Sequence, residues 1–304
     1  MDNGQRAPVH ILWTGGWDST FQLLRLLLVH RVPVRPVYLI DAKRRSLQVE
    51  LQTMDRIRAR LLELHPETRG LLLPTLTAKV EEVPLDPQVT QAFRRLQARA
   101  PIGSQYEWLA SFCLQQGLSE VELGAEKTRS GAGALVAPEI VAATRARGGY
   151  ETHRIIPGLD PDMDVVFGRY ALPLFEMTKQ DMAREVDERG WRPLMLETWF
   201  CHQPAGGFPC GRCNPCHSVV KAGLGWRIPV RRRLVGAVHG ATLGFARRTA
   251  RRLLLRLRGL TAAPGRRPLD GGRSADQPAQ HAQPAGPHAD RGAEAGQEEV
   301  HQYP

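Results

Sequence analysis

The chain has 304 residues, 42% of them hydrophobic, which is enough to bury the core of one or two globular domains. No stretch is apolar over the length that a membrane-spanning helix needs, and the polar segment 1–8 does not resemble a secretory signal, so we expect a cytoplasmic protein. Five cysteines in a chain of this length do not suggest a disulfide scaffold and favour reduced thiols with a metal.

The formal net charge is +10, but its source is local. The segment 227–260 contains ten arginines and no carboxylate, so the rest of the chain is close to neutral. An affinity for nucleic acid or for a membrane surface would therefore reside in this segment alone.

The first part of the chain predicts strands and helices in alternation. Residues 9–13 are an apolar run typical of a buried strand, and the apolar segment 18–29 predicts a helix directly after it. The β-rich run 34–40 predicts a second strand. Apolar residues then recur at helical spacing over 47–61, and Pro66 ends this helix.

The alternation continues in the second part of the chain. The remaining predicted elements are a third strand over 71–75, a helix over 88–98, a helix over 108–116, a fourth strand over 121–124, and a helix that Gly190 closes. Ser104 and Thr178 each begin a capping-box pattern before one of these helices. The Gly- and Ala-rich segment 126–149 predicts a loop with one helix. We therefore expect an α/β fold with a parallel, doubly wound sheet whose ligands bind beyond the C-terminal strand edges.

The turn between the first strand and the first helix is the most informative local feature. It reads Thr14-Gly15-Gly16-Trp17-Asp18-Ser19-Thr20. Two glycines let the backbone turn sharply, which aims the first N–H groups of the helix at a bound anion. The alternative is an ordinary tight turn without a ligand. The run resembles the Ser-Gly-Gly-x-Asp-Ser pyrophosphate loop of the ATP pyrophosphatases, with Thr14 in place of the first serine.

Four of the cysteines fall within sixteen residues: Cys201, Cys210, Cys213 and Cys216. This spacing lets the thiolates close around one ion, so a tetrahedral zinc site with a structural role fits the set. An iron–sulfur cluster is the main competitor. His202 and His217 are possible substitute ligands, although four thiolates already suffice. Cys113 lies within the apolar pattern of a predicted helix, and we expect it in the core.

The two motifs together make the chain similar to the 7-cyano-7-deazaguanine synthase family, ATP-dependent enzymes of the queuosine precursor pathway. Members carry the Gly-Gly-x-Asp-Ser loop near the N-terminus and, after Thr-Trp, four cysteines with the spacing nine, three and three. Here Thr198-Trp199 precedes Cys201, about 190 residues after the loop. Leu172-Pro173-Leu174 with Thr178-Lys179 resembles the family's proline and lysine segment. The resemblance covers roughly residues 9–221.

The resemblance implies a sheet of the HUP or PP-loop type in an ATP-binding domain over residues 7–196, followed by a four-cysteine zinc subdomain over 197–222. Composition adds an arginine-rich helical segment over 223–260. Beyond it, Pro, Gly, Ala, Gln and His dominate, so we expect a disordered tail over 261–304.

The resemblance also implies a reaction and its reactants. A carboxylate attacks the α-phosphate of ATP, giving an acyl-adenylate and pyrophosphate. Ammonia then forms an amide, and a second adenylation can dehydrate that amide to a nitrile. The implied small molecules are ATP with Mg²⁺, ammonia, and 7-carboxy-7-deazaguanine or a related acid.

The glycine turn supplies most of the residues expected to act on ATP. Backbone N–H groups of Gly15, Gly16 and Trp17, with the Ser19 and Thr20 hydroxyls, would hold the leaving pyrophosphate. Asp18 is interpreted either as a ligand of Mg²⁺ or as an acidic residue that only stabilises the first helical turn.

Other candidates lie outside the turn. Lys127, Arg129 and Lys179 are either phosphate or carboxylate contacts or solvated surface charges. Asp41 follows the second strand, where an adenosine-binding edge would lie. The aromatic pair Trp199-Phe200 either stacks on a deazapurine or packs in the core.

The chain departs from the family where the base-carrying substrate is bound. Ser104-Gln105 stands where the family has an Arg-Asn pair, and residues 126–132 replace its acidic Ser-Gly-Tyr-Pro-Asp loop. The resemblance therefore supports the ATP half and the metal half more strongly than the substrate half.

The arginine-rich segment has several interpretations. Its apolar run 234–246 has thirteen residues and is too short to cross a bilayer. A contact with RNA, an anionic membrane or a protein partner, or a merely solvated helix, all fit the pattern. An oligomer is also compatible with the sequence.

Three function classes fit the whole chain. The first is an ATP-dependent ligase that forms a carbon–nitrogen bond. The second is an RNA-modifying ligase or thiolase of the same fold, in which the arginine-rich segment would bind RNA. The third is a catalytically weakened nucleotide-binding module.

Overall fold

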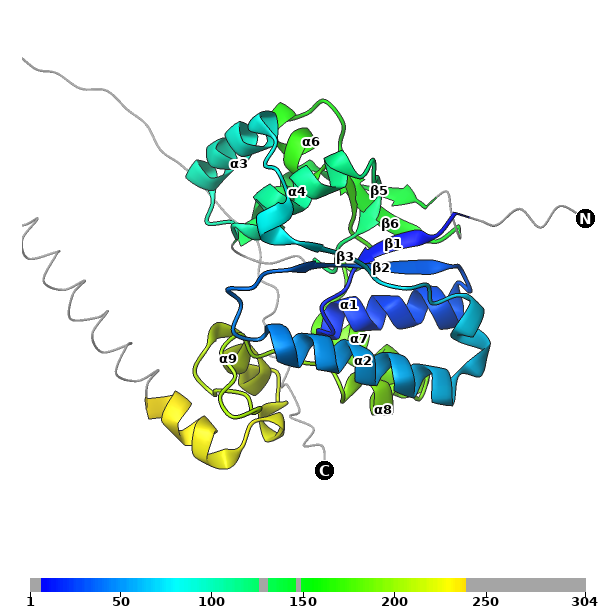
Figure 1. Cartoon of the computed structure of the whole chain (residues 1–304), viewed down its shortest axis with the longest axis vertical. Helices are drawn as coiled ribbons and strands as arrows, with labels where there is room; N and C mark the ends of the chain where they lie inside the picture. Colours follow the sequence, from blue (N-terminus) through cyan, green and yellow to red (C-terminus); the bar gives the residue numbers. More distant parts are fainter. Residues whose placement is uncertain (1–6, 126–130, 146–148, 239–304) are drawn as a thin grey trace, which may run out of the picture. The chain divides into compact units, whose positions relative to one another are not determined.

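Five short strands form a parallel sheet at the centre of the fold (Figure 1). The computed structural model describes residues 7–125, 131–145 and 149–238, which belong to a unit running from Met1 to Ala250. The strand order is β3-β2-β1-β4-β7. The bounds are β1 (Val9–Leu12), β2 (Val34–Ile40), β3 (Leu76–Lys79), β4 (Val121–Glu122) and β7 (Tyr170–Ala171). The predicted α/β class with a parallel sheet is confirmed.

The order of the strands reverses between β1 and β4. From β1 the chain proceeds outward through β2 to β3, and it then crosses back to place β4 on the other side of β1. In open parallel sheets, a ligand crevice forms outside the carboxyl ends of the strands at such a reversal. The turn that follows β1 lies at this point.

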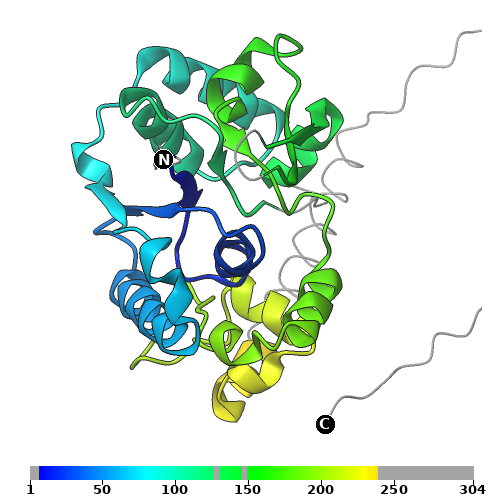
Figure 2. The same ribbon diagram turned by 90° about the vertical axis from the view of Figure 1, so that its right-hand side faces the viewer.

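One layer of helices covers the first face of the sheet. It contains α1 (Trp17–Leu24), which continues as a π-helical turn over Arg25–Val29, with α2 (Leu47–Leu64), α7 (Lys179–Glu188) and α8 (Arg192–Met195). Seen at right angles, α1 is nearly end-on, with α2 on one side and the later green helices on the other (Figure 2). Phe21, Leu61 and Trp191 are buried together in this layer.

A second layer covers the opposite face. It contains α3 (Pro87–Arg99), α4 (Gln105–Gln115) and α6 (Pro161–Phe167) (Figure 1). Phe93, Phe112 and Phe167 form its core, together with Cys113, which is fully buried. Burial raises the pKa of the Cys113 thiol to about 11. The prediction that Cys113 is a packed core thiol is confirmed, and helices on both faces confirm the doubly wound arrangement.

Two predicted elements differ from the structure. The third strand is β3 at 76–79 rather than 71–75, because only Leu72 of the predicted run makes a bridge, to Val34. Pro74 lacks the N–H that would continue the ladder. The predicted loop at 126–149 does contain one helix, α5 (Gly131–Val136), but it also enters an antiparallel hairpin. The hairpin strands are β5 (Ile140–Thr144) and β6 (Glu151–Ile155).

A buried polar cluster fixes the end of this hairpin against the sheet. Glu122 of β4 is fully buried and accepts hydrogen bonds from Gln22 Nε2 at 2.7 Å and from the Tyr150 hydroxyl. The buried Arg145 lies 3.9 Å from the same carboxylate. Burial raises the pKa of Glu122, although these partners oppose the shift. Buried polar groups require such partners, so the cluster specifies where the hairpin docks.

The two predicted capping boxes have different outcomes. At Thr178 the box is complete, because its hydroxyl accepts from the backbone N–H of Asp181 while the Asp181 carboxylate accepts from the Thr178 backbone N–H. Ser104 has helical dihedral angles and makes no capping hydrogen bond, so this prediction is wrong. Gly190 follows α7 with φ of +68°, as expected of a helix stop.

The four-cysteine segment follows α8 and leads into α9 (Asn214–Lys221) and a further helical stretch over 230–238. Short 3₁₀ turns complete the described elements, at Pro66–Gly70, Val80–Glu82, Ala137–Glu139 and Gly225–Arg227. Among the described helices, none combines the length and apolar character needed to span a bilayer. The predicted tail over 261–304 and most of the arginine-rich segment lie outside the described residues.

Candidate functional site

The two glycines of the turn after β1 have different structural roles. Gly15 has φ of +69°, and a Cβ there would lie 2.9 Å from the Cγ2 atom of Thr53 in α2. Gly16 has φ of −78°, a value open to any residue, and the nearest atom to a Cβ there is Thr14 Oγ1 at 3.4 Å. The backbone therefore requires glycine at Gly15, whereas Gly16 keeps the space in front of α1 free of a side chain.

The N-terminus of α1 is open for an anion. Gly16 is its N-cap and offers no side chain to cap the first N–H groups. The first hydrogen bond of the helix joins Thr20 N to Gly16 O at 3.0 Å, so the N–H groups of residues 17–19 precede the helical ladder. Such groups, with the helix dipole, attract phosphate.

A cavity of about 250 Å³ lies in front of this turn. Its walls come from the ends of β1, β2 and β4 and from the first turns of α1 and α4. The residues that line it are Leu12, Thr14, Gly16, Trp17, Asp18, Ser19, Val37, Tyr38, Leu39, Arg44, Gln105, Trp108, Leu109, Leu123 and Gly124. The cavity is therefore at the reversal of strand order, where a doubly wound sheet binds its ligands.

Lys179 lies beside the glycine turn in the structure, although the two are far apart in the sequence. Its ammonium forms an ion pair with the carboxylate of Asp18, which is in the first turn of α1. The Thr178 capping box fixes the start of α7 and thereby the position of Lys179. The structure thus unites two of the predicted site residues that lie 161 positions apart.

Arg44 is a cation at the cavity that was not predicted from the sequence. Arg44 lines the cavity and lies 3.1 Å from the buried carboxylate of Glu50, which also accepts from the Tyr38 hydroxyl at 2.9 Å and from Ser46 Oγ at 2.6 Å. Burial and this carboxylate raise the pKa of Tyr38, which remains a neutral donor. The network holds Arg44 where it can meet an anion.

Gly124 and Trp108 at the cavity were not singled out from the sequence, whereas Gln105 belongs to the Ser104-Gln105 pair that replaces the family's Arg-Asn pair. Gly124 follows β4 so closely beside α1 that a Cβ there would lie 3.2 Å from Asp18 Cβ and 3.3 Å from Ser19 N. Gln105 and Trp108 project from the first turn of α4. For Gly124 and Trp108, a position near the end of a strand or the start of a helix was the only available signal, because glycine and tryptophan have many other uses.

Several predicted residues lie away from the cavity. Thr20 is fully buried and its hydroxyl accepts from Trp13 Nε1 at 3.0 Å, so the expectation that it contacts a ligand is wrong for this structure. Asp41 follows β2 as expected, but its carboxylate accepts from the Lys43 N–H at 2.9 Å and does not line the cavity. Lys127 and Arg129 lie outside the described residues.

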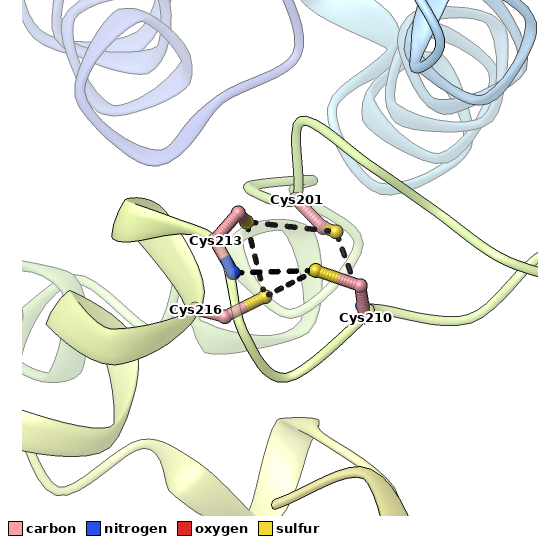
Figure 3. Close-up of side chains that lie close together, drawn as sticks. All are labelled: Cys201, Cys210, Cys213 and Cys216. Atoms are coloured by element: carbon pink, nitrogen blue, oxygen red, sulfur yellow. Dashed lines mark hydrogen bonds between the residues drawn. The ribbon is translucent and has the colours of Figure 1, made fainter. Parts of the chain in front are cut away.

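The four cysteines of the C-terminal motif form a single cluster (Figure 3). Their sulfur atoms all lie within 4.8 Å of one another. The measured separations are 3.4 Å for Cys213 and Cys216, 3.8 Å for Cys201 and Cys213, and 3.9 Å for Cys210 and Cys216. Zn–S bonds of about 2.3 Å in a tetrahedron place sulfurs about 3.8 Å apart, so the cluster fits one tetrahedral ion.

Local backbone features close this cluster. Ala205 and Phe208 pair across Gly206 and Gly207, both with positive φ, which returns the chain toward Cys201 in a tight hairpin turn. Gly211, with φ of +78°, bends the chain after Cys210. The remaining two thiols come from the start of α9, whose N-cap is Cys213.

Backbone N–H groups point at the sulfurs, as they do around metal-bound thiolates. Cys210 N donates to Cys201 Sγ at 3.1 Å, and the N–H groups of Arg212 and Cys213 donate to Cys210 Sγ at 3.5 and 3.4 Å. Burial opposes ionisation of Cys210, but these donors lower its pKa to about 7. Burial raises the pKa of Cys201 to about 11. A cation at the centre would offset the cost of ionising such buried thiols.

The cysteine cluster is connected to the glycine turn. Trp199 N donates to the carbonyl of Gly15 at 2.9 Å, and the Trp199 indole donates to Cys201 O at 2.7 Å. Trp199 and Phe200 stack on each other and pack against the cysteines, and Arg227 lies 5.0 Å from the Phe200 ring. Of the two interpretations of this aromatic pair, the structure supports packing.

No protein-family model matches the chain, and no curated protein matches it significantly.

Proposed function

We propose that this protein is an ATP-dependent ligase with a PP-loop type fold that transfers AMP to a carboxylate and then joins it to ammonia. One observation carries the proposal. The glycine turn, the uncapped N-terminus of α1 and a cavity of about 250 Å³ coincide at the reversal of strand order. A turn buried under side chains would have left no room for a nucleotide.

The reaction begins with adenylation. A carboxylate oxygen of the substrate attacks the α-phosphorus of ATP, and the bond to the bridging oxygen of pyrophosphate breaks. Pyrophosphate then carries the negative charge that the N–H groups of residues 17–19 and the Ser19 hydroxyl can stabilise. These groups are held in position before ATP arrives, which is the condition for electrostatic stabilisation of a transition state.

The second step forms the carbon–nitrogen bond. Ammonia attacks the carbonyl carbon of the acyl-adenylate, AMP leaves, and a proton passes to solvent, which gives an amide. A second ATP can adenylate the amide oxygen, and loss of AMP with two protons from nitrogen then gives a nitrile. Nothing in this route requires a nucleophilic side chain, and none of the five cysteines lines the cavity. This argues for the ligase and against a thiolase that uses cysteine.

Asp18 and Arg44, which line the cavity, and Lys179, which is paired with Asp18, fit the handling of ATP. Lys179 would transfer from Asp18 to a phosphate oxygen when the nucleotide binds, which would leave Asp18 free as a ligand of Mg²⁺. The Mg²⁺ ion would neutralise phosphate charge. Arg44, which also lines the cavity, would bind the carboxylate of the acid or the α-phosphate.

The four cysteines would hold a structural zinc ion. Four thiolates leave no open position for substrate, and their spacing suits a single ion better than a cluster that spreads its thiolates over several irons. The zinc ion would cross-link the four cysteines and would take no part in the reaction.

The acid that we propose is 7-carboxy-7-deazaguanine or a close relative. The resemblance of the two motifs supports this choice, and Trp17 and Trp108 are among the residues that line the cavity.

The test is a product assay on the purified full-length chain. The protein is incubated with MgATP, ammonia and 7-carboxy-7-deazaguanine, while pyrophosphate release is followed and the product is identified by mass. We expect pyrophosphate release that depends on the acid, and the mass of the amide or the nitrile. Asp18→Asn should reduce the rate about tenfold or more, as expected when one charged group at a phosphate site is lost.

Two results would overturn parts of the proposal. Release of pyrophosphate only with a different acid would reject the named substrate and leave the ligase intact. Absence of ATP binding by a correctly folded, zinc-loaded protein would reject the ligase itself.

A further inference from the structure

The helical stretch 230–238 presents an apolar face to solvent. Val230, Leu234 and Val238 are 60%, 63% and 64% exposed, and Val235 beside them is also exposed. In a helix with 3.6 residues per turn, positions four apart lie above one another, so the first three form a continuous row. Figure 1 shows this yellow helix at the edge of the molecule. Exposed apolar groups in a contiguous row indicate a contact surface.

The opposite face of this helix is fixed to the cysteine segment. Gly236 is buried, and a Cβ atom there would overlap the carbonyl oxygen of Gly211. The carbonyl of Arg232 also abuts Gly211. Because this face is occupied by the loop between Cys210 and Cys213, the apolar row must point away from the body of the protein.

Every charged residue of the helical stretch 230–238 is an arginine. Arg231 is exposed between the apolar residues of the helix. The segment 227–260 contains ten arginines and no carboxylate. Its ten positive charges equal the net charge of the whole chain, +10. A row of Val and Leu flanked by arginines, with Trp226 exposed just before it, has the composition of helices that lie in a membrane interface.

We propose that this face binds the surface of an anionic lipid bilayer, with Leu234 and its neighbours in the apolar boundary and Arg231, Arg232 and Arg233 on the headgroups. RNA would use the arginines but would leave the apolar row in water. A second copy of the chain would cover the row but would bring its own Arg231, Arg232 and Arg233 into the same interface. A lipid surface satisfies both features, because it offers apolar chains beneath negative charge.

The proposal is tested by co-sedimentation of the full-length protein with vesicles. One preparation contains phosphatidylcholine alone, and the other contains phosphatidylcholine with phosphatidylglycerol. We expect binding to the anionic vesicles and little binding to the neutral ones. Leu234→Ser should weaken binding about tenfold, because a buried leucine side chain is worth that much or more.

Two further variants separate apolar insertion from simple charge attraction. Leu234→Glu and Leu159→Glu change the net charge by the same amount, and Leu159 is 57% exposed on the loop between β6 and α6. We expect Leu234→Glu to abolish binding and Leu159→Glu to leave it nearly unchanged. Unfolding curves of both variants verify that the chain stays folded.

Three results would overturn the proposal. Equal losses in the two glutamate variants would show attraction by charge alone. Retention of single-stranded RNA without any vesicle binding would assign the surface to nucleic acid. A dimer that forms without lipid and dissociates in Leu234→Glu would assign the row to a second copy.

Discussion

The two adjacent glycines in the turn after β1 predict different effects of the same substitution, on stability at Gly15 and on ATP binding at Gly16. Gly15→Ala should destabilise the protein by about 1–2 kcal/mol, since a side chain at positive φ is strained. Thr53 would also be crowded. Gly16→Ala should change the free energy of unfolding by less than about 0.5 kcal/mol. Its methyl group would instead occupy the cavity and weaken ATP binding about tenfold or more. Urea unfolding and calorimetric ATP titration measure the two effects.

The comparison separates structure from ligand binding within one turn. If Gly16→Ala binds ATP as tightly as the unmodified protein, the anion does not approach α1, and the proposed site is wrong. If both variants lose equal stability, the different roles assigned to the two glycines fail. The sequence alone could not make this distinction, because the clash at Gly15 depends on α2 and on Thr53, which is 38 residues away.

At the level of the helix, Thr178 and Ser104 form a matched pair for testing caps. Thr178→Ala should cost about 1 kcal/mol of stability, because it removes the hydroxyl that accepts the Asp181 N–H. Ser104→Ala should cost close to nothing, since Ser104 makes no capping hydrogen bond. Thermal or urea unfolding of the two variants measures the difference. Equal costs would mean that the sequence pattern, and not the observed geometry, decides capping.

Elements with strong local signals were predictable from the sequence, and elements that depend on distant partners were not. The apolar run of β2 and the periodicity of α2 gave nearly the observed bounds. The strand β3 was misplaced because its pairing with β2 outweighs the local apolar run 71–75. The β5–β6 hairpin was missed because its anchor, Glu122, is a charge in a buried strand, and its partners Tyr150 and Arg145 come from distant sequence.

Over the whole molecule, the sequence located the two motifs but did not place them side by side. The glycine turn and the thiols were each identified from spacing. That Trp199 N bonds to Gly15 O follows only from the path of the chain through the sheet and α8. The same path brings Lys179 to Asp18 and Gln105 to the cavity. The site is thus assembled from segments spread over nearly two hundred residues, which no single pattern reveals.

This assembly predicts that metal removal acts on the nucleotide site. The two large cores that cover the sheet do not include the four clustered cysteines, so chelation should leave most of the far-UV circular dichroism unchanged. The segment 198–201 would lose its anchor, and with it the hydrogen bond to Gly15. We expect ATP affinity to fall about tenfold or more and to return when zinc is restored.

Cysteine variants test the same connection without a chelator. Cys216→Ser removes one thiol of the cluster and should reproduce the loss of both metal and ATP affinity. Cys113→Ala removes a thiol from the core between the sheet and the second helix layer. This variant should keep the metal and lose only some stability. Metal content by elemental analysis and ATP affinity by titration are measured on each. A metal-free protein that binds ATP as tightly as the loaded one would show that the Trp199 contact does not hold the turn.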